Sequence, residues 1–436
     1  MTDVLLIGGG GREHAIAWKL RQSPKLTDLH VAPGNAGSAA IAHNIDLPLP
    51  RTGAPPSSVE PYLNAAVKLA RDLEVDLVFV APDDPLSWGL VDRLEAAGIP
   101  AFGPSQAAAQ IEASKAWAGD FVRRHGIAHP WSAAFSDLRA ARAFVREQTV
   151  QLVVKASGLA AGKGAIVTSA TEEALDALDS LMENRSVGEA GSTVVVMERL
   201  FGRETSAHAF TDGKTVVHMP FSCDHKAVFD GGLGPNTGGM GVYSPPAWLL
   251  ASVEDQIRHR VTEAAVRAMA SEGRPYRGVI YPGVMVTAAG PQVIEFNARL
   301  GDPEAEALLP RLESDLLDIA LACVNGTLDR LDVRWRPEAS VCVTLASGGY
   351  PGSYTTGLPV TGLDSLEPDV VVFHAGTRMD NGRLLTNGGR VLNVVALGAD
   401  LEAARRRAYA NVERIHFEGM HYRRDIGAAQ EAGVSV

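Results

Sequence analysis

The sequence predicts an α/β enzyme built from more than one domain. Short apolar runs alternate with helical patterns along most of the chain, which is the pattern of α/β domains. The 436 residues exceed the usual size of one domain, and the 44 glycines are spread along the whole length. With 46% hydrophobic and 21% charged residues, the composition is that of a soluble globular chain with glycine-rich loops.

The N-terminal part carries the clearest alternation. We expect strands at Val4–Ile7, Leu29–Ala32 and Leu77–Ala81, and helices at Glu13–Gln22, Val59–Leu73 and Leu86–Ala97. Strands and helices that alternate in this way form a parallel sheet with crossover helices. We therefore predict an N-terminal α/β domain over residues 1–104.

The rest of the chain divides into two further units. A helix from Ser105 to His125 leads to elements expected at Leu152–Ala156, Ala165–Thr168, Glu172–Asn184 and Thr193–Glu198. A helical stretch, Val253–Ser271, precedes two apolar strands at Val279–Val286 and Gln292–Phe296. Later strands are expected at Val341–Leu345, Val370–His374 and Val391–Leu397, before a helix at Leu401–Ile415. We predict a second domain over residues 105–330 and a small α/β domain over residues 331–436.

Charge and cysteine content narrow the class of protein. The formal net charge of −11 argues against a broad surface for nucleic acid. The three cysteines are far apart and indicate neither a disulfide framework nor a metal site, which fits a reducing cytoplasm. The N-terminus runs directly into a strand, and no apolar run is long enough to span a bilayer, so we expect no secretory signal and no membrane partner.

The first motif, GGGGREH at residues 8–14, joins a strand to a helix, where backbone N–H groups can hold a phosphate. A dinucleotide fingerprint fits poorly, because its third glycine would fall on Glu13 and the next strand ends in PGNAG without an acidic residue for a ribose. This disfavours a dehydrogenase. We expect a small phosphorylated substrate here; glycines that serve only the turn are the alternative.

The segment VVKASGLAAGKGAIV places Lys155 at a strand end and follows it with a loop that contains Gly158, Gly162, Lys163 and Gly164. Glycines let a backbone approach phosphate oxygens, and lysine supplies charge for the β- and γ-phosphates. The loop is not a Walker loop, because Gly164 stands where Ser or Thr would bind magnesium. We expect a flap over nucleotide phosphates, although taken alone a structural hairpin explains the pattern equally well.

Two later segments carry carboxylates at strand ends. In VVVMERLFGRE, the backbone near Glu198 can contact an adenine edge and a carboxylate can hold ribose hydroxyls; solvated surface carboxylates are the alternative. In VIEFNARLGDPE, Glu295 and Asn297 face the same side of a strand and offer the oxygen ligands that Mg²⁺ takes along with nucleotide phosphates. Arg299 lies on that side if the strand continues and can fork two hydrogen bonds to an anion, and the next turn brings Asp302 near.

The segment DHKAVFDGGLGPNTGGMG, residues 224–241, is too rich in glycine and polar residues to be core. Loops of this kind often hold substrates. We expect Lys226 to contact phosphate and Asn236 and Thr237 to contact a substrate, whereas His225 is expected to be structural.

These motifs, in this order, resemble those of the phosphoribosylamine–glycine ligase family of the ATP-grasp superfamily. The resemblance also covers Ser114–Lys115, FHAGT at residues 373–377, NGGRVLNV at residues 387–394 and DIG at residues 425–427. It implies an ATP-grasp fold that combines α/β and α+β parts, with a Rossmann-like N-terminal domain, a mobile flap subdomain at about residues 126–197 and a small C-terminal domain. It also implies that ATP activates glycine as glycyl phosphate, which the amine of phosphoribosylamine then attacks.

The resemblance further implies a role for each site residue. ATP would be bound by Lys115, Lys155, Gly162, Lys163, Gly164, Glu198, Leu200 and Glu204, and Mg²⁺ or Mn²⁺ by Glu295 and Asn297. The substrates would be bound by Gly10, Gly11, Arg12, Glu13, Asn35, Asp83, Asp224, Asn236, Thr237 and Gly238, with Arg299, Asp302 and Lys226 in catalysis. The expected partners are small molecules, and the chain is expected to be a monomer or a homodimer.

Some positions depart from the family pattern. Ser157 replaces Asp, Cys223 replaces Gln, Ala227 replaces Arg, Gly232 replaces Asp, Asp83 replaces Glu, Gly119 replaces Lys and Glu306 replaces Gln. A divergent amide-forming ligase with another amino acid or amine is therefore the alternative function. A non-catalytic nucleotide-binding scaffold is disfavoured, because it would not need the metal ligands Glu295 and Asn297.

Overall fold

The structure is a computed structural model that describes residues 1–160 and 162–428, and it begins with a five-stranded sheet in the order β3-β2-β1-β4-β5. The strands are β1 (Thr2–Gly8), β2 (Leu26–Pro33), β3 (His43–Asn44), β4 (Leu77–Val80) and β5 (Ala101–Phe102). Every neighbouring pair runs parallel, so the predicted parallel sheet is confirmed.

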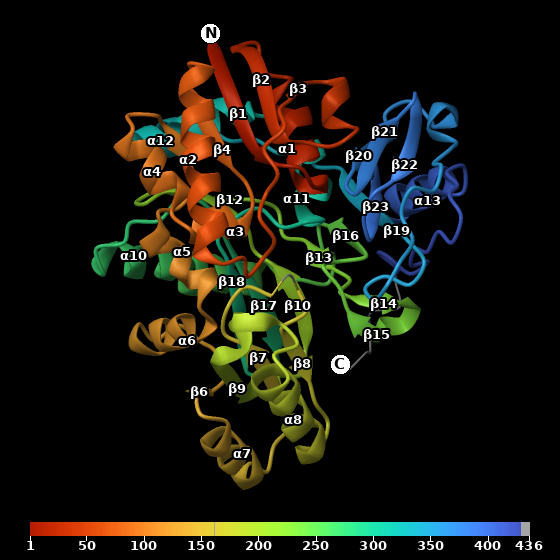
Figure 1. The fold of residues 1–436 in the computed structure, drawn as a ribbon. Coiled ribbons are helices and arrows are strands. Elements are labelled where there is room, and N and C mark those ends of the chain that lie inside the picture. The colour runs from red at the N-terminus through yellow and green to blue at the C-terminus, as the bar shows by residue number, and fades with distance from the viewer. Residues whose placement is uncertain (161, 429–436) are drawn as a thin grey trace.

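Helices cover both faces of this sheet. They are α1 (Gly11–Leu20), α2 (Pro56–Asp72), α3 (Asp83–Ser87), α4 (Leu90–Ala96) and α12 (Leu316–Asn325). Side chains of a strand alternate between its two faces. Leu5 and Ile7 therefore pack with α2 and α4, whereas Val4 and Leu6 pack with α1 and α12. In Figure 1, α1 and α2 lie on opposite sides of β1.

The helix expected from Ser105 to His125 is two helices, α5 (Gln106–Ala113) and α6 (Lys115–Arg124). Ser114 between them has an extended backbone, and its hydroxyl accepts a hydrogen bond from the N–H of Trp117 at 3.2 Å. A serine with this geometry caps the helix that follows, so the side chain itself explains the break. The new start places Lys115 at the first position of α6.

A four-stranded antiparallel sheet in the order β6-β9-β7-β8 forms a lobe at the lower end of Figure 1. Its strands are β6 (Ser132–Phe135), β7 (Leu152–Ala156), β8 (Ala165–Val167) and β9 (Val194–Glu198), and its helices are α7 (Leu138–Glu147) and α8 (Thr171–Leu178). Val145 of α7 and Leu178 of α8 join Val154 and Val196 of the sheet in one apolar core. The lobe therefore has its own core, and the loop expected as a flap joins β7 to β8.

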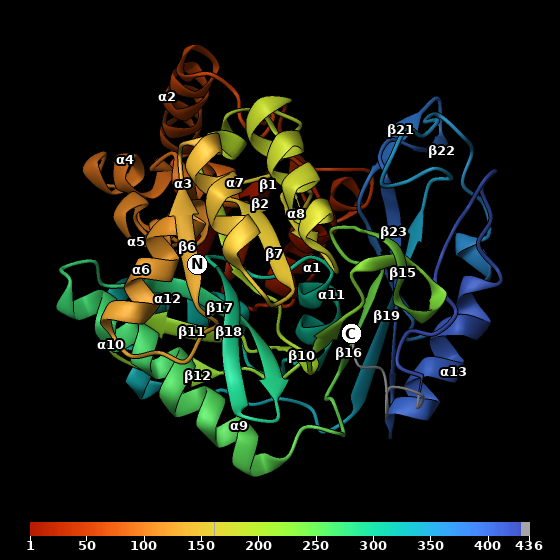
Figure 2. The same ribbon diagram turned by 90° about the horizontal axis from the view of Figure 1, so that it is seen from below.

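A central antiparallel sheet lies between this lobe and the N-terminal sheet in Figure 1, and Figure 2 shows it from below, beside the lobe. It contains β10 (Arg203–Ser206), β11 (Ala209–Asp212), β12 (Val216–His218), β17 (Arg277–Thr287) and β18 (Gly290–Asn297), and α9 (Ala251–Ile257) and α10 (Glu263–Ser271) pack against it. The long strand β17 pairs with β10, β11 and β18. The two apolar strands expected before residue 297 are thus confirmed as β17 and β18.

The last sheet combines strands from distant parts of the chain in the order β13-β16-β19-β23-β20. They are β13 (Cys223–Asp224), β16 (Gly241–Ser244), β19 (Ala339–Ala346), β20 (Val371–His374) and β23 (Arg390–Gly398), and α13 (Leu401–Val412) packs on the sheet. Two of these strands come from the range predicted as the second domain. The predicted domain limits remain predictions, but this last sheet contains strands from both sides of residue 331.

Within the described part of the chain, no helix is long and apolar enough to cross a membrane.

Candidate active site

Charged side chains from four elements and one loop meet between the lobe and the central sheet. This lysine–glutamate cluster consists of Lys115, Lys155, Lys226, Glu204 and Glu295. Lys226 forms ion pairs with Glu204 and, at 3.3 Å, with Glu295. Lys155 extends from β7 and donates a hydrogen bond to the carbonyl of Ile294 in β18 at 2.9 Å. The cluster therefore joins the lobe to the central sheet.

The cluster is electropositive. Lys226 lowers the pKa of Glu295 to about 2 against the effect of burial, and Lys155 and Lys115 add to the effect. Burial lowers the pKa of Lys155, and the neighbouring Lys115 and Lys226 lower it further. Because three ammonium groups face two carboxylates, a polyphosphate would relieve the repulsion among the lysines.

The base of the glycine-rich loop is fixed to the start of α6 through Ser157. This residue is buried, its carbonyl accepts the N–H of Lys115 at 2.9 Å, and its hydroxyl accepts the N–H of Ala116 at 3.1 Å. These two N–H groups would otherwise lack partners at a helix N-terminus. The contact sets the position of Lys115 relative to Lys155.

The glycine-rich loop lies against the segment that carries Lys226. A Cβ atom on Gly162 would stand 3.4 Å from the carbonyl oxygen of Thr237. Thr237 in turn donates from its backbone and its hydroxyl to the carbonyl of Lys226, both at 2.8 Å. Lys163 is exposed. Residue 161 of this loop lies outside the described residues.

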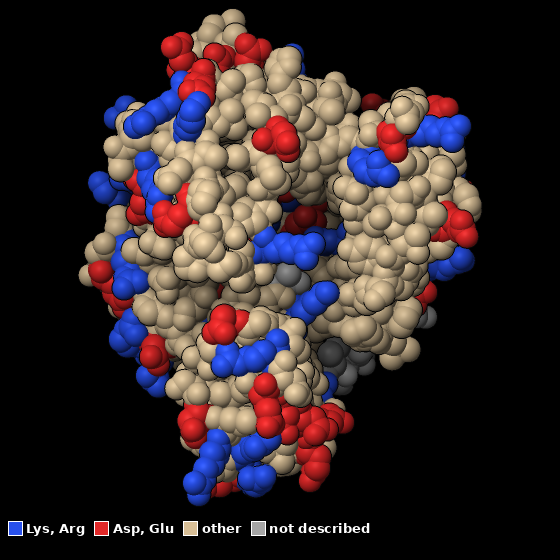
Figure 3. Space-filling model, in the orientation of Figure 1, with Lys and Arg blue, Asp and Glu red and all other residues tan. Residues whose placement is uncertain are grey.

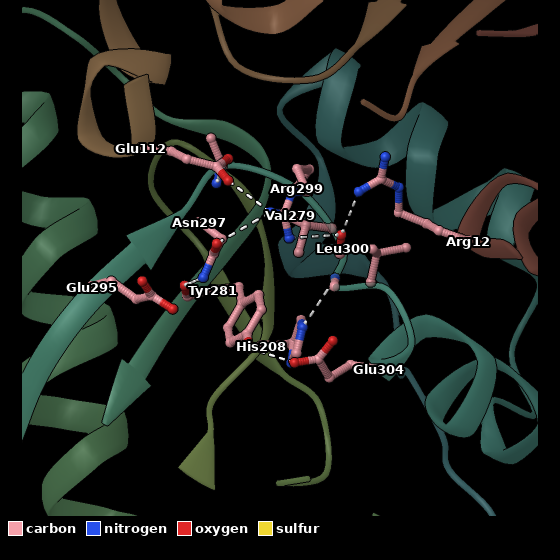
Figure 4. A network of polar contacts seen from close by, with 12 residues as sticks. Arg12, Glu112, His208, Val279, Tyr281, Glu295, Asn297, Arg299, Leu300 and Glu304 are labelled. Atoms are coloured by element: carbon pink, nitrogen blue, oxygen red, sulfur yellow. Dashed lines mark hydrogen bonds and ion pairs between the residues drawn. The ribbon is translucent and has the colours of Figure 1, made fainter. Parts of the chain in front are cut away.

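Asn297 and Arg299 lie side by side although β18 ends at Asn297 (Figure 4). The guanidinium of Arg299 donates to Asn297 Oδ1 at 3.2 Å and to Glu112 Oε1 at 2.8 Å. The other oxygen of Glu112 accepts the N–H of Ala298 at 2.7 Å. Glu112 on α5 thus fixes the segment after β18, a role that sequence reasoning missed.

A buried acidic network lies beside Arg299. Tyr281 donates to the carboxylate of Glu304 and lies 2.9 Å from the hydroxyl of Ser206. His208 stacks on Tyr281 with ring centroids 3.9 Å apart (Figure 4). Burial raises the pKa of Asp224, as does the nearby carboxylate of Glu304. Oδ1 of Asp224 is buried and has no hydrogen-bond partner within the described residues.

A cavity of about 340 Å³ opens next to this network. It is lined by Gly9, Gly10, Gly11, Gly34, Asn35, Asp302, Tyr350, Ala375, Gly376, Thr377, Asn387 and Arg390. The wall thus joins the two N-terminal glycine motifs to the C-terminal sheet. Figure 3 shows a hollow in the middle of one face, with Lys and Arg atoms at its edge and Asp and Glu atoms inside.

Two predicted substrate residues hold the cavity wall together. Glu13 accepts the N–H of Gly10 at 2.6 Å and pairs with Arg12 at 2.6 Å, so it caps α1. The amide of Asn35 donates to the carbonyl of Gly9 at 3.0 Å and to that of His374 at 2.7 Å. Asn35 therefore connects the first motif to the C-terminal sheet.

Arg390 is the second important residue that sequence reasoning missed. It pairs with Asp302 at 3.0 Å and donates to the carbonyl of Gly238 at 2.6 Å. The N–H of Gly238 donates to the hydroxyl of Tyr350 at 3.2 Å. The NGGRVLNV motif contains Arg390, but the hydrogen bonds of its side chain span 88 residues or more of sequence, so only the fold shows what the guanidinium contacts.

The structure places the predicted site residues in two neighbouring groups. The lysine–glutamate cluster, with Asn297, forms one group, and Gly10, Gly11, Arg12, Glu13, Asn35 and Asp302 form the other around the cavity. The negative charge of Asp83 raises the pKa of Arg12 and that of Arg299. Asn236 and Lys163 are exposed, and Glu198, the last residue of β9, and Leu200 are half-buried. The roles of all these residues in binding remain predictions.

The departures from the family pattern lie outside the cavity lining. The thiol of Cys223 donates to the carbonyl of Glu204 at 3.4 Å. Ala227 is buried in β14 (Ala227–Phe229). Gly232 is exposed with φ +72°, and a Cβ there would meet open space. These positions, like Ser157, do not line the cavity.

Two antiparallel sheets that enclose the lysine–glutamate cluster, beside a parallel N-terminal sheet, define the ATP-grasp class of proteins. A biotin carboxylase structure from Campylobacter jejuni shares this fold, with a TM-score of 0.72 over 99% of this chain and 96% of that chain at 14% identity. The chain belongs to the phosphoribosylglycinamide synthetase family. Models of the N domain, the ATP-grasp (A) domain and the C domain of this family match residues 2–112, 113–305 and 340–429.

Individual relatives match over nearly their full length. Phosphoribosylamine–glycine ligase from Vibrio cholerae is 46% identical over 98% of this chain and 97% of its own length. The protein of the same name from Rhizobium meliloti is 45% identical and covers 97% of both chains. A phosphoribosylamine–glycine ligase structure from Thermotoga maritima has a TM-score of 0.82 at 32% identity, covering 97% of this chain and all of that chain. The expected fold and family are thus confirmed.

Proposed function

We propose that the protein joins glycine to 5-phosphoribosylamine at the expense of ATP, giving glycinamide ribonucleotide, ADP and phosphate. The observation that carries the proposal is the adjacency of the electropositive cluster and the cavity, which are linked by the segment from Asn297 to Asp302. A nucleotide in one place and a phosphorylated amine in the other would meet across this segment. The shared name of the near full-length relatives supports the same substrates.

ATP fits the lysine–glutamate cluster. Lys115, Lys155 and Lys226 would bind the phosphates, and Glu204 would exchange its ion pair with Lys226 for the ribose hydroxyls. The backbone at Glu198 and Leu200 would contact the adenine. Glycines of the loop before β8 would cover the phosphates.

A divalent cation fits Glu295 and Asn297. Lys226 keeps the pKa of Glu295 low, so its carboxylate is charged, and Asn297 Oδ1 is already polarised by Arg299. Carboxylate and amide oxygens are suitable ligands for Mg²⁺ or Mn²⁺. The cation would offset phosphate charge when bound.

The amino acid fits between Arg299 and Asp224. The guanidinium of Arg299 would hold the carboxylate of glycine, and the unpartnered Asp224 Oδ1 would hold its ammonium group. A carboxylate oxygen then attacks the γ-phosphorus, the bond from the γ-phosphorus to the β-phosphate breaks, and ADP leaves. The product is an acyl phosphate whose carbonyl carbon is open to an amine.

Phosphoribosylamine fits the cavity, with its phosphate at the Gly9–Gly11 turn. Its amine attacks the acyl carbon, the C–O bond to phosphate breaks, and the departing phosphate takes up the proton that the amine loses. Burial favours the neutral form of Asp302, but Arg390 and Arg12 outweigh it and hold the pKa of Asp302 below its usual range. Such a weak base orients the amine rather than removing its proton.

A different acid or amine substrate is less well supported. That alternative depends on the departures from the family pattern, and Ser157, Ala227 and Gly232 do not line the cavity. Relatives that match more than nine-tenths of this chain carry the glycine ligase name.

The test is ADP and phosphate release by the purified chain with Mg²⁺, ATP, glycine and phosphoribosylamine. We expect one ADP and one phosphate for each glycinamide ribonucleotide formed. Glu295→Gln should lower the rate about a hundredfold or more, because an amide is a poorer metal ligand. Glu402→Gln, on a side chain that is 87% exposed, should leave the rate unchanged. Absence of phosphate release when both substrates are added would refute the proposal.

A further inference from the structure

Glu306 lies fully buried in α11 (Glu304–Leu308), directly beneath the Gly10–Gly11 turn of the cavity wall. Its Oε1 accepts a hydrogen bond from the amide of Asn393 at 2.8 Å, and Asn393 Oδ1 accepts one from the hydroxyl of Thr344, also at 2.8 Å. A Cβ on Gly11 would stand 2.4 Å from Glu306 Oε1 and 2.5 Å from the nitrogen of Asn393. The turn therefore rests on the hydrogen bond between Glu306 and Asn393.

The cations near Glu306 are engaged by other carboxylates. Arg390 pairs with Asp302 at 3.0 Å, and Arg12 pairs with Glu13 at 2.6 Å. In residues 1–160 and 162–428, Glu306 has no ion pair within 4.0 Å, and its Oε2 is buried without a hydrogen-bond partner. A buried carboxylate that lacks a counter-charge is strongly disfavoured against the neutral acid.

The surrounding charges act in the same direction. Burial and the negative charge of Asp302 raise the pKa of Glu306, and the more distant Arg390 and Arg12 only partly offset this. Asp302 itself stays ionised because it lies next to those two arginines. Cys342 on β19, which also faces the pair, remains a neutral thiol because burial raises its pKa. These effects together favour the negative charge on Asp302 and the neutral form of Glu306.

We propose that Glu306 is held as a neutral carboxylic acid and that in this form it positions the Gly10–Gly11 turn at the cavity wall. Its carbonyl oxygen accepts from Asn393, and its proton removes the charge that would repel Asp302. Glu306 is a positioning residue, since it acts on a ligand through the turn above it. The identity of that ligand, a phosphorylated ribose, depends on the proposed function.

Two measurements on the full chain test this proposal near neutral pH. Glutamine has the shape of glutamic acid but never carries its charge or acid proton. The infrared spectrum of Glu306→Gln should therefore lack one carbonyl band of a protonated carboxyl group that the wild type shows. Affinity for ribose 5-phosphate, measured by calorimetry, should stay within about twofold of wild type in Glu306→Gln. It should fall about tenfold in Glu306→Met, which leaves the buried amide of Asn393 without an acceptor.

Glu402→Gln serves as the control for loss of an exposed carboxylate, and its protonated-carboxyl bands should match the wild type. An unchanged set of these bands in Glu306→Gln would overturn the proposal. So would a loss of affinity in Glu306→Gln as large as that in Glu306→Met, because the ionised carboxylate would then be the active form. Failure of the wild type itself to bind ribose 5-phosphate would count against the proposed substrate instead, since the infrared result does not depend on a ligand.

Discussion

Glu112 reaches the site from α5, and its two oxygens hold the backbone of Ala298 and the guanidinium of Arg299. Burial raises the pKa of Glu112 to about 7, while Arg299 opposes the shift. Above that pH the carboxylate is ionised and balances the charge of Arg299. Below it, the neutral acid leaves Arg299 less firmly oriented, so the placement of Arg299 depends on pH in the physiological range.

We expect the rate to fall as pH is lowered through about 7, because Glu112 takes up a proton there. Glu112→Gln should lower the rate at pH 8 and should remove this acid limb, since an amide does not titrate. The measurement is a kcat/KM profile for glycine at saturating ATP. Glu189→Gln, whose side chain is 86% exposed, is the control. An acid limb of unchanged midpoint in Glu112→Gln would assign the titration to another group.

The protonation of Asp224 should change when glycine binds. Its pKa is raised by burial and by Glu304, so glycine binding should draw a proton from it as the ammonium group arrives. Calorimetry in two buffers of different ionisation enthalpy should therefore detect proton release. Asp224→Asn should abolish this release and weaken glycine at least about tenfold, with little effect on ATP binding. Equal proton release in the variant would exclude Asp224 as the partner of the ammonium.

Some residues within motifs could be proposed for the site from the sequence, whereas Glu112, which lies outside any motif, could not. Lys155, Glu295 and Asn297 are marked by local patterns of strand and glycine. Glu112 contacts Arg299 across 187 residues of sequence, and no local feature distinguishes it from any other helical glutamate. Arg390 stood in a recognised motif, but its partners belong to other segments.

Elements with strong apolar patterns were predicted close to their true limits, as β4, β7 and β18 show. The prediction of one helix at residues 105–125 was wrong only at Ser114, because a single serine within a helical pattern can also lie on the exposed face of an unbroken helix. The hairpin of β14 and β15 (Leu233–Asn236) could not be foreseen. β14 is only three residues long, and β15 has the fully exposed sequence LGPN, so neither strand has a pattern that predicts pairing.

The conformation of the glycine-rich loop depends on the backbone of Gly162. Gly162 has φ +76°, where an alanine costs about 1 kcal/mol or more. Gly162→Ala should therefore raise the KM for ATP about fivefold while global stability changes little. Gly273→Ala, at φ +73° with open space around it, supplies the same backbone penalty away from the loop. If both variants had wild-type KM for ATP, the loop conformation would not matter for nucleotide binding.

At the scale of the whole molecule, the predicted order of three units is recognisable, but the C-terminal sheet crosses the limit at residue 331. Strands β13 and β16 are only two and four residues long, so their apolar pattern is too short to read from sequence. β16 pairs with β19 along Gly241–Ser244. Whether the chain is a monomer or a homodimer, and whether it resides in the cytoplasm, remain predictions.

A chain that ends at residue 330 should misassemble, because it leaves the edge of β16 unpaired and uncovers the apolar residues that pack on β19. We expect most of it to be insoluble or to form large oligomers by analytical ultracentrifugation. Co-expression of residues 331–436 should restore part of the soluble fraction. A monomeric, cooperatively folded 1–330 chain would show that the unit folds without its later strands.

The C-terminal sheet pairs strands that the ribosome synthesises at different times. Ser244 of β16 is synthesised long before Ala339 of β19, and at about 5–20 residues per second the delay is on the order of 5–20 seconds. Lys226 lies between β13 and β16, so its position depends on strands that do not yet exist. We therefore expect Lys226 to join Lys115 and Lys155 only when the ribosome has nearly finished the protein, so an incomplete chain would lack the complete lysine–glutamate cluster.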